Sequence, residues 1–169
     1  MSETIRPADR DDVPGILAIL NEAIETTTAS WHHRPLTLAQ QLAWFDAKQA
    51  EGWPVLVAEA ADGGIAGWAT FGPFRPWEGY RFTVEHSVYV DGAHRRRGIA
   101  TRLLTALIEE ARRRGLHAML GGTSGENTES MVLHERLGFE QVARFPEIGE
   151  KFGRRLDLVF FELLLEDER

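Results

Sequence analysis

The sequence predicts a mixed α/β fold in which helices cover both faces of a sheet. Two observations lead to this fold class. Apolar residues repeat with helical spacing in some segments and alternate as in strands in others, and these segments follow one another in the order β-α-α-β-β-β-α-β-α-β-β. The chain of 169 residues contains no repeat and no linker rich in Pro, Gly or Ser, so we expect a single domain over residues 1–169.

The first half of the chain is expected to hold a strand, two helices and a pair of strands. "TIRPA" is typical of a short strand, and a helix follows from about residues 11 or 12, with Pro14 in its first turn. After the irregular segment "TTTASWHHRP", Thr37 and Gln40 form a capping box that opens a helix reaching about Lys48. "PVLVAEA" and "IAGWATFGPF" are then two strands joined by the turn "ADGG".

The second half is expected to hold a long strand, two helices and three more strands. "YRFTVEHSVYV" alternates, which places Phe82, Val84, His86, Val88 and Val90 on one face and Thr83, Glu85, Ser87 and Tyr89 on the other. A helix from about Gly98 to Arg114 ends at Gly115, and the strand "HAMLGG" follows. A short helix from about Glu129 to Leu137 precedes the closing strands "FEQVARF" and "LDLVFFELLL".

Composition excludes several classes of function. A formal net charge of −7 argues against nucleic acid or an anionic membrane as the main partner. The chain has no cysteine, which excludes disulfides, thiolate nucleophiles and zinc–thiolate sites. The adjacent His32 and His33 do not converge as metal ligands do, so we expect no metal. No apolar run has signal-peptide or membrane-spanning length, and we expect a cytoplasmic protein.

The stretch "HRRRGIATRLL" concentrates positive charge where a helix begins in an acidic protein. The N-terminus of a helix has free N–H groups and a partial positive charge, so it binds phosphate. Arg95 and Arg96 add charge-assisted hydrogen bonds to the same anion, and Gly98 permits a tight backbone approach. A pyrophosphate cradle is one interpretation, and a solvated basic turn is the other. Dinucleotide and P-loop motifs are absent.

"SVYVDGAHRRRGIATRLL" resembles the acetyl-CoA pyrophosphate motif of the GNAT superfamily of N-acetyltransferases, [Q/R]-x-x-G-x-[G/A], with Arg95, Gly98 and Ala100 at the fixed positions. "YRFTVEHSVYV" and "NTESMVLHERLGFEQVARFPEIGEKFG" resemble the phosphinothricin or methionine sulfoximine acetyltransferase branch. The resemblance implies a twisted, mostly antiparallel sheet of about seven strands flanked by about four helices. In such a fold a splayed parallel pair of strands forms the acetyl-CoA cleft.

The resemblance also implies which residues bind acetyl-CoA as co-substrate. The pantetheine arm pairs with the backbone of the strand that ends at Val90, and the pyrophosphate lies on the amides at the start of the following helix. An asparagine before the short helix holds the pantetheine arm, although Asn127 also suits helix capping. The residues expected to contact acetyl-CoA are Val88, Tyr89, Val90, Arg95, Arg96, Arg97, Gly98, Ile99, Ala100, Thr101, Asn127 and Ser130.

Two residues are expected to perform the chemistry. Glu85 is the candidate general base, since a protonated amine must lose a proton before it attacks a thioester. The alternative is that Glu85 is a surface charge on a strand. His134 stands where many family members have a tyrosine that protonates the departing thiolate, and a histidine can donate that proton. The alternative for His134 is a buried structural role.

The substrate-binding residues are expected around the active strand and the irregular segment. Arg75 and Arg81 present guanidinium groups that suit a carboxylate or a phosphinate. The further candidates are Thr27, Trp31, Phe71 and Thr83. Lys151 matches the family, whereas Arg155 stands where the family has an aromatic residue.

We therefore expect an enzyme that transfers the acetyl group of acetyl-CoA to the amine of a small amino acid such as phosphinothricin, methionine sulfoximine or methionine sulfone. One alternative is acetylation of another amine, in a protein N-terminus, a polyamine or an aminoglycoside. A second alternative is a non-catalytic module that binds acyl-CoA. The family and the apolar strand "LVFFELLL" suggest a homodimer.

Overall fold

The computed structural model describes residues 2–165. Four helices, α1 to α4, alternate with seven strands, β1 to β7, in the order that the sequence predicts. The helices span Val13–Thr26, Leu38–Glu51, Ile99–Arg113 and Thr128–Arg136. The strands span Thr4–Pro7, Val55–Glu59, Ile65–Pro73, Thr83–Val90, Ala118–Ser124, Glu140–Lys151 and Arg154–Leu164.

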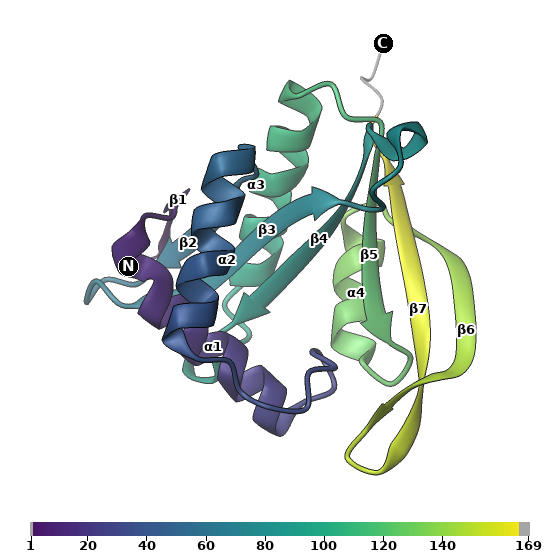
Figure 1. The fold of residues 1–169 in the computed structure, drawn as a ribbon, viewed down its shortest axis with the longest axis horizontal. Coiled ribbons are helices and arrows are strands. Elements are labelled where there is room, and N and C mark those ends of the chain that lie inside the picture. The colour runs from purple at the N-terminus through teal and green to yellow at the C-terminus, as the bar shows by residue number, and fades with distance from the viewer. Residues whose placement is uncertain (1, 166–169) are drawn as a thin grey trace.

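The strands form one sheet in the order β1-β2-β3-β4-β5-β7-β6. Every neighbouring pair is antiparallel except β4 and β5, which run parallel. The fold class is therefore the predicted one: a mostly antiparallel sheet with a single parallel pair inside it. Figure 1 shows β4 and β5 diverging from their common start toward the lower edge of the view.

Two helices cover each face of the sheet (Figure 1). Apolar residues of α1 and α2 pack with β2 and β3 around Trp68. On the opposite face, the apolar stripe of α3 packs against β3, β4 and β5 around Phe71 and Met119. The periodic positions of the predicted helices supply both clusters, because each helix buries one stripe of side chains. The sheet is thus anchored from both sides, and β4 lies at its centre.

The local signals in the sequence define most helix ends correctly. Thr37 and Gln40 form the predicted capping box, and Pro14 lies in the first turn of α1. Strand β4, however, begins at Thr83, and Phe82 lies outside it with 49% of its surface exposed. The prediction that Phe82 shares a strand face with Val84 was therefore wrong.

The last hairpin is longer than the sequence predicts. Strand β6 continues past Phe145 to Lys151, with irregular register between Phe145 and Gly149. Proline can lie in an edge strand where the pairing is interrupted, and this is the position of Pro146. The extra residues carry the hairpin beyond the rest of the sheet (Figure 1). Within residues 2–165, no helix is both long enough and apolar enough to cross a membrane.

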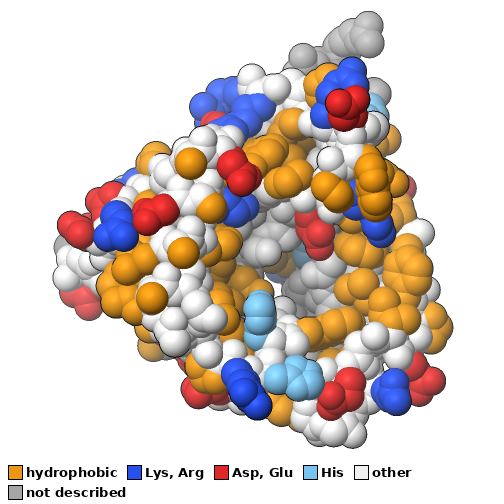
Figure 2. Space-filling view, viewed as in Figure 1, with side chains coloured by type: hydrophobic (Ala, Val, Ile, Leu, Met, Phe, Trp, Pro, Cys, Tyr) orange, Lys and Arg blue, Asp and Glu red, His pale blue; other side chains and the backbone are white. Residues whose placement is uncertain are grey.

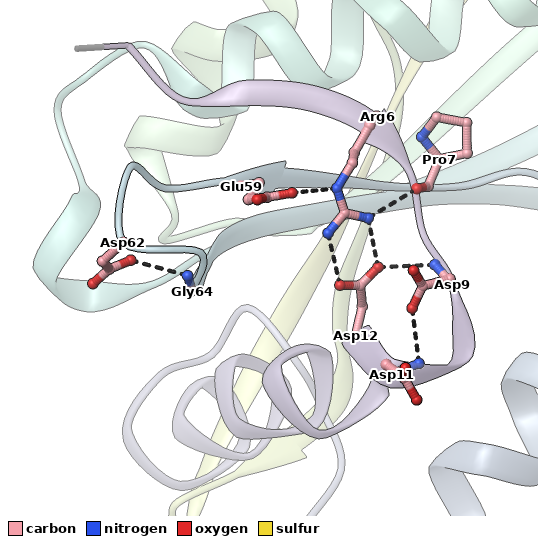
Figure 3. A network of polar contacts seen from close by, with 8 residues as sticks. All are labelled: Arg6, Pro7, Asp9, Asp11, Asp12, Glu59, Asp62 and Gly64. Atoms are coloured by element: carbon pink, nitrogen blue, oxygen red, sulfur yellow. Dashed lines mark hydrogen bonds and ion pairs between the residues drawn. The ribbon is translucent and has the colours of Figure 1, made fainter.

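A polar network fixes the N-terminal strand to the start of α1 (Figure 3). Arg6 donates to both carboxylate oxygens of Asp12, at 2.8 and 2.9 Å, and also pairs with Glu59 on β2. Asp12 in turn accepts a hydrogen bond from the amide of Asp9 at 2.8 Å. The hydrogen bonds from Arg6 hold the pKa of Asp12 below its usual range. Protonation of this buried carboxylate would therefore weaken its pairing with Arg6.

We expect Asp12→Asn to lower the free energy of unfolding by about 1–3 kcal/mol at neutral pH, the cost of leaving a charged partner poorly satisfied. Because folding lowers the pKa of Asp12, its carboxylate stabilises the fold above the pKa of the unfolded chain, about 3.9, and this contribution is lost as the pH falls through the folded-state value. Urea unfolding at pH 7 and at decreasing pH measures the effect. A difference between the two proteins that persisted undiminished in acid would contradict it.

Candidate active site

The parallel strands β4 and β5 pair over only three residues. Their register ends with Glu85 opposite Leu120. Beyond this point β4 pairs only with β3, as far as Val90, and β5 only with β7, as far as Ser124. The backbone edges that face one another across the gap therefore have no strand partner, and they remain available to an extended ligand. This is the predicted splayed pair. We call the gap between residues 86–90 of β4 and residues 121–124 of β5 the fork.

The N-terminus of α3 lies at the open end of this fork. Gly98 caps the helix in the left-handed conformation, with φ 73°, and no side chain of the described residues caps the first amides. Arg96 also has a positive φ of 62°, which is uncommon for a residue with a side chain. Such turns gather successive N–H groups into an anion-binding concavity. The first turn of α3 is thus built to accept an anion from the fork.

A cavity of about 990 Å³ joins the fork to the start of α3. It opens onto the face shown in Figure 2, where the molecule is hollowed at its centre. The predicted site residues that line it are Thr27, Glu85, Val88, Tyr89, Val90, Arg95, Arg96, Gly98, Ile99, Ala100, Thr101, Asn127, Ser130 and His134. The structure therefore brings most of the predicted cofactor residues together with both candidate catalytic residues.

Glu85 lies at the last paired position of β4 and is half-buried. Its Oε1 and the ring of Phe160 both lie close to Gly122. A Cβ added to Gly122 would be 3.3 Å from each of them, so the carboxylate lies close to an apolar side chain. No side-chain hydrogen bond of Glu85 occurs within residues 2–165. Burial raises its pKa, and the positive charge of Arg75 opposes this effect. A half-buried carboxylate without a hydrogen-bonding partner can accept a proton from a ligand in the cavity.

His134 is enclosed on α4, and both of its ring nitrogens are engaged. Nδ1 lies 2.6 Å from the carbonyl oxygen of Ser130, which can only accept, so Nδ1 carries the hydrogen. Nε2 lies 2.9 Å from Nε2 of His86. Burial lowers the pKa of His134, and burial together with His134 lowers that of His86 to about 3. In its neutral form, His134 has no free N–H for a ligand in the cavity.

Asn127 and Ser130 lie at the N-terminus of α4. The Asn127 side chain accepts a hydrogen bond from the amide of Ser130 at 3.1 Å and so caps the helix. The capping role that the sequence allows is therefore present, and the same residue also lines the cavity.

The far wall of the cavity forms where the loop between α1 and α2 meets the tip of the β6–β7 hairpin. Lys151 is buried, with 2% of its surface exposed. Its Nζ donates to the carbonyl of Thr27 at 2.6 Å and also to that of Ser30. Trp31 lies against Gly149, whose Cβ would come within 2.3 Å of the indole ring. Segments more than a hundred residues apart in the sequence thus meet through one ammonium group and one aromatic ring.

Six predicted residues do not line the cavity. Arg97 turns away and pairs with Glu3 at 3.8 Å. Arg81 lies over the ring of Phe82, at 4.6 Å. Phe71 is fully buried in the core under α3, because it is paired with His86 and so faces away from Glu85. The others are Trp31, Thr83 and Arg75, of which only Arg75 acts on the charge of Glu85.

The model of the Acetyltransferase (GNAT) family matches residues 16–139, most of the chain. The chain belongs to the GNAT family.

Individual relatives agree in length and fold. An L-methionine sulfoximine/L-methionine sulfone acetyltransferase of Pseudomonas paraeruginosa is 50% identical, over 100% of this chain and 98% of its own. A structure from Salmonella typhimurium with its cofactor acetyl-CoA is 46% identical with a TM-score of 0.94, covering 100% of this chain and 96% of the other. A phosphinothricin acetyltransferase from Sinorhizobium meliloti in complex with acetyl-CoA is 31% identical with a TM-score of 0.94, covering 97% and 89%.

Several residues of this GNAT cavity were missed by the sequence analysis. Phe152 and Arg154 line it from the hairpin, and Glu126 accepts two hydrogen bonds from Arg154, at 2.8 and 2.9 Å. The sequence signal that could have located this hairpin is the glycine of the dipeptide Phe152-Gly153. In the structure these two residues have positive φ angles of 54° and 71° and form a tight two-residue turn. Arg155 is exposed and stands opposite Glu150, outside the cavity lining. Within residues 2–165, no group of three or more His, Cys, Asp or Glu could hold a metal ion.

We expect Lys151→Met to loosen the loop between α1 and α2, because two backbone carbonyls lose a charged donor. Hydrogen bonds to charged groups contribute about 1.5–3 kcal/mol each, so the open population of the loop should rise at least about tenfold. The measurement is the rate of chymotrypsin cleavage after Trp31 in the native protein. The control is Arg144→Met on the same hairpin, which removes an exposed ion pair with Asp157. Equal cleavage rates in all three proteins would show that Lys151 does not hold the loop.

Proposed function

We propose that this GNAT protein transfers the acetyl group of acetyl-CoA to the amine of a small amino acid, of the methionine sulfoximine, methionine sulfone or phosphinothricin type. The observation that carries the proposal is the fork between β4 and β5, because it joins an uncapped helix N-terminus to an unpaired, half-buried carboxylate within one cavity. The relatives support the choice of acceptor, since their names include these compounds.

The residues present fit acetyl-CoA. The amides from Arg96 to Thr101 would hold its diphosphate, with Arg95 and Arg96 adding charge-assisted hydrogen bonds. The backbone of β4 from Val88 to Val90 would pair with the amide groups of the pantetheine arm, as an added strand does. When bound, acetyl-CoA would supply the acetyl group from its thioester.

Glu85 is proposed as the general base. An amino acid has a protonated amine at neutral pH, and the carboxylate of Glu85 accepts that proton directly or through one water. The neutral nitrogen forms a bond to the acetyl carbon, the carbon–sulfur bond breaks, and the second proton of the nitrogen leaves with the thiolate as the thiol. His134 is neutral and fully engaged, so it positions groups in this scheme and does not supply the proton.

Arg75 is proposed to recognise the negative group of the acceptor. It is the predicted arginine whose charge reaches Glu85, and a guanidinium fork suits a carboxylate or a phosphinate. Arg81 takes no part in this proposal, because its guanidinium lies over the ring of Phe82 and its charge is not among those that act on Glu85. Thr27 and its neighbours at the α1–α2 loop, together with Phe152, form the opposite wall.

The homodimer stays a prediction. Three exposed apolar side chains on the edge strand β6 support it, namely Val142, Phe145 and Ile148, with 50%, 44% and 58% of their surfaces exposed. Edge strands with exposed apolar residues favour pairing with another chain.

We expect Glu85→Gln to lower kcat/KM about 10²- to 10⁴-fold, the range for loss of a general base, with little change in acetyl-CoA affinity. Release of free thiol from acetyl-CoA, measured with methionine sulfoximine and with phosphinothricin, gives the rates. Unchanged turnover in the variant would remove Glu85 from the mechanism.

The pH dependence gives a second test of the same residue. A protonated Glu85 cannot accept a proton, so kcat/KM should fall as the pH drops through its raised pKa. Arg75 opposes that rise, so Arg75→Ala should move this fall to higher pH and raise the acceptor KM. The control is Arg112→Ala, an exposed residue of α3 outside the cavity lining. A profile that moves equally in both variants would contradict the role of Arg75.

The cofactor site can be tested at Gly98. We expect Gly98→Ala to weaken acetyl-CoA binding at least about tenfold, because a Cβ in the left-handed conformation strains the turn that must approach the diphosphate. Gly52→Ala is the matched control, since Gly52 caps α2 with φ 77° and lies outside this cavity. Both variants should lose about 1–2 kcal/mol of stability, but only the first should lose calorimetric binding of acetyl-CoA. Equal affinities would argue against a diphosphate at α3.

A further inference from the structure

The point where β4 and β5 separate is filled by two histidines that face each other. The strands last pair at Glu85 and Leu120, and the next residues along them are His86 and Gly121. His86 and His134 approach to 2.9 Å between their Nε2 atoms, directly over Gly121. A Cβ at Gly121 would lie 2.2 Å from Nε2 of His134 and 2.5 Å from Nε2 of His86, so only glycine fits beneath the pair.

The hydrogen-bond chemistry fixes which ring donates. The Nδ1 of His134 carries a hydrogen because its partner is the carbonyl of Ser130. A neutral imidazole has one N–H, so Nε2 of His134 is an acceptor and Nε2 of His86 is the donor. The Nδ1 of His86 is then a bare acceptor, and it is buried without a hydrogen-bond partner among residues 2–165. A proton added to the pair would have to reside at that unpartnered position or break the contact between the rings.

The surroundings keep the pair uncharged. His134 stacks on Phe161 at 5.0 Å, and both rings lie edge-on to Phe139, at 5.1 and 5.6 Å. Within residues 2–165, neither ring hydrogen-bonds or pairs with a charged side chain. The two histidines thus connect β4 to α4 by one directed hydrogen bond in an apolar setting, where such a bond is stronger than in water.

We propose that His86 is a positioning residue for acetyl transfer: its Nε2–H holds His134 as a neutral acceptor and sets the spacing between β4 and α4 at the start of the cofactor cleft. This inference rests on the proposed function. β4 supplies Val88 and Val90, and Asn127 caps the start of α4, so the pair joins the two walls between which the pantetheine arm would lie. Loss of the N–H donor of His86 would therefore weaken binding of acetyl-CoA more than binding of the amino-acid substrate.

The first test is the protonation state of each histidine nitrogen. In protein labelled with ¹⁵N-histidine, NMR at neutral pH should show a hydrogen on Nδ1 of His134 and on Nε2 of His86, with the other two nitrogens bare. Variants His86→Gln and His134→Gln identify the signals among the six histidines. A hydrogen on Nε2 of His134 would overturn the proposal. This measurement does not depend on turnover, so it separates failure of this inference from failure of the proposed function.

The second test is kinetic. His86→Met keeps the volume of the side chain but removes the donor, and His86→Gln keeps an N–H at a similar position. We expect His86→Met to raise the KM for acetyl-CoA about tenfold, because Nε2 of His134 is then buried without a hydrogen-bond donor. The KM for the amino-acid substrate should change little. His86→Gln should restore most of the loss. His117→Gln, at an exposed histidine, should match the unchanged protein. Equal effects of His86→Met and His86→Gln, or an equal rise in both KM values, would contradict the role. If His86→Met does not fold, the nitrogen assignments and the His86→Gln kinetics still decide.

Discussion

The structure depends on the separation of β4 and β5 after three paired residues. Each strand keeps a full partner on its outer side, so the sheet stays continuous while two inner backbone edges are left open. Open edges inside a sheet are costly unless something satisfies or shields them. Here α3 enters at the wide end of the fork, and the histidine pair fills its narrow end over Gly121. The cavity therefore exists because β4 and β5 stop pairing after Glu85, and the surrounding elements keep the two strands apart.

The sequence predicts the features that local chemistry decides. The Arg-Gly turn, the capping box at Thr37 and the alternation around Glu85 each depend on residues a few positions apart, and all three occur as expected in the structure. The features that depend on distant contacts were not predictable. Alternation shows that Phe71 and its neighbours occupy different faces, but only the pairing with β4 shows which face holds Glu85. Lys151 contacts carbonyls more than 120 residues earlier, and no local pattern indicates this.

Positive charge is concentrated at one end of the cavity, although the chain as a whole is acidic. The net charge is −7, yet Arg95, Arg96 and the free amides of α3 lie at one end of the cavity. Positive potential confined to a hollow raises the local concentration of small anions there. Arg97 lies outside the cavity lining and, with Arg102, pairs with Glu3. This arrangement supports the proposed binding of a diphosphate at the start of α3.

Glu85 lies in the cavity that would hold both the cofactor and the acceptor, and two features of its surroundings act on its pKa. Burial raises its pKa, whereas Arg75 lowers it. If the anionic group of the acceptor binds Arg75, it neutralises the charge that opposes the rise, and the pKa of Glu85 increases further. A carboxylate with a higher pKa is the stronger base toward the ammonium group of the same acceptor. In the proposed mechanism, an acceptor without a carboxylate or a phosphinate would bind without this gain. Glu85 and Arg75 together would therefore select for acceptors that carry such a group, at the step of proton removal as well as at binding.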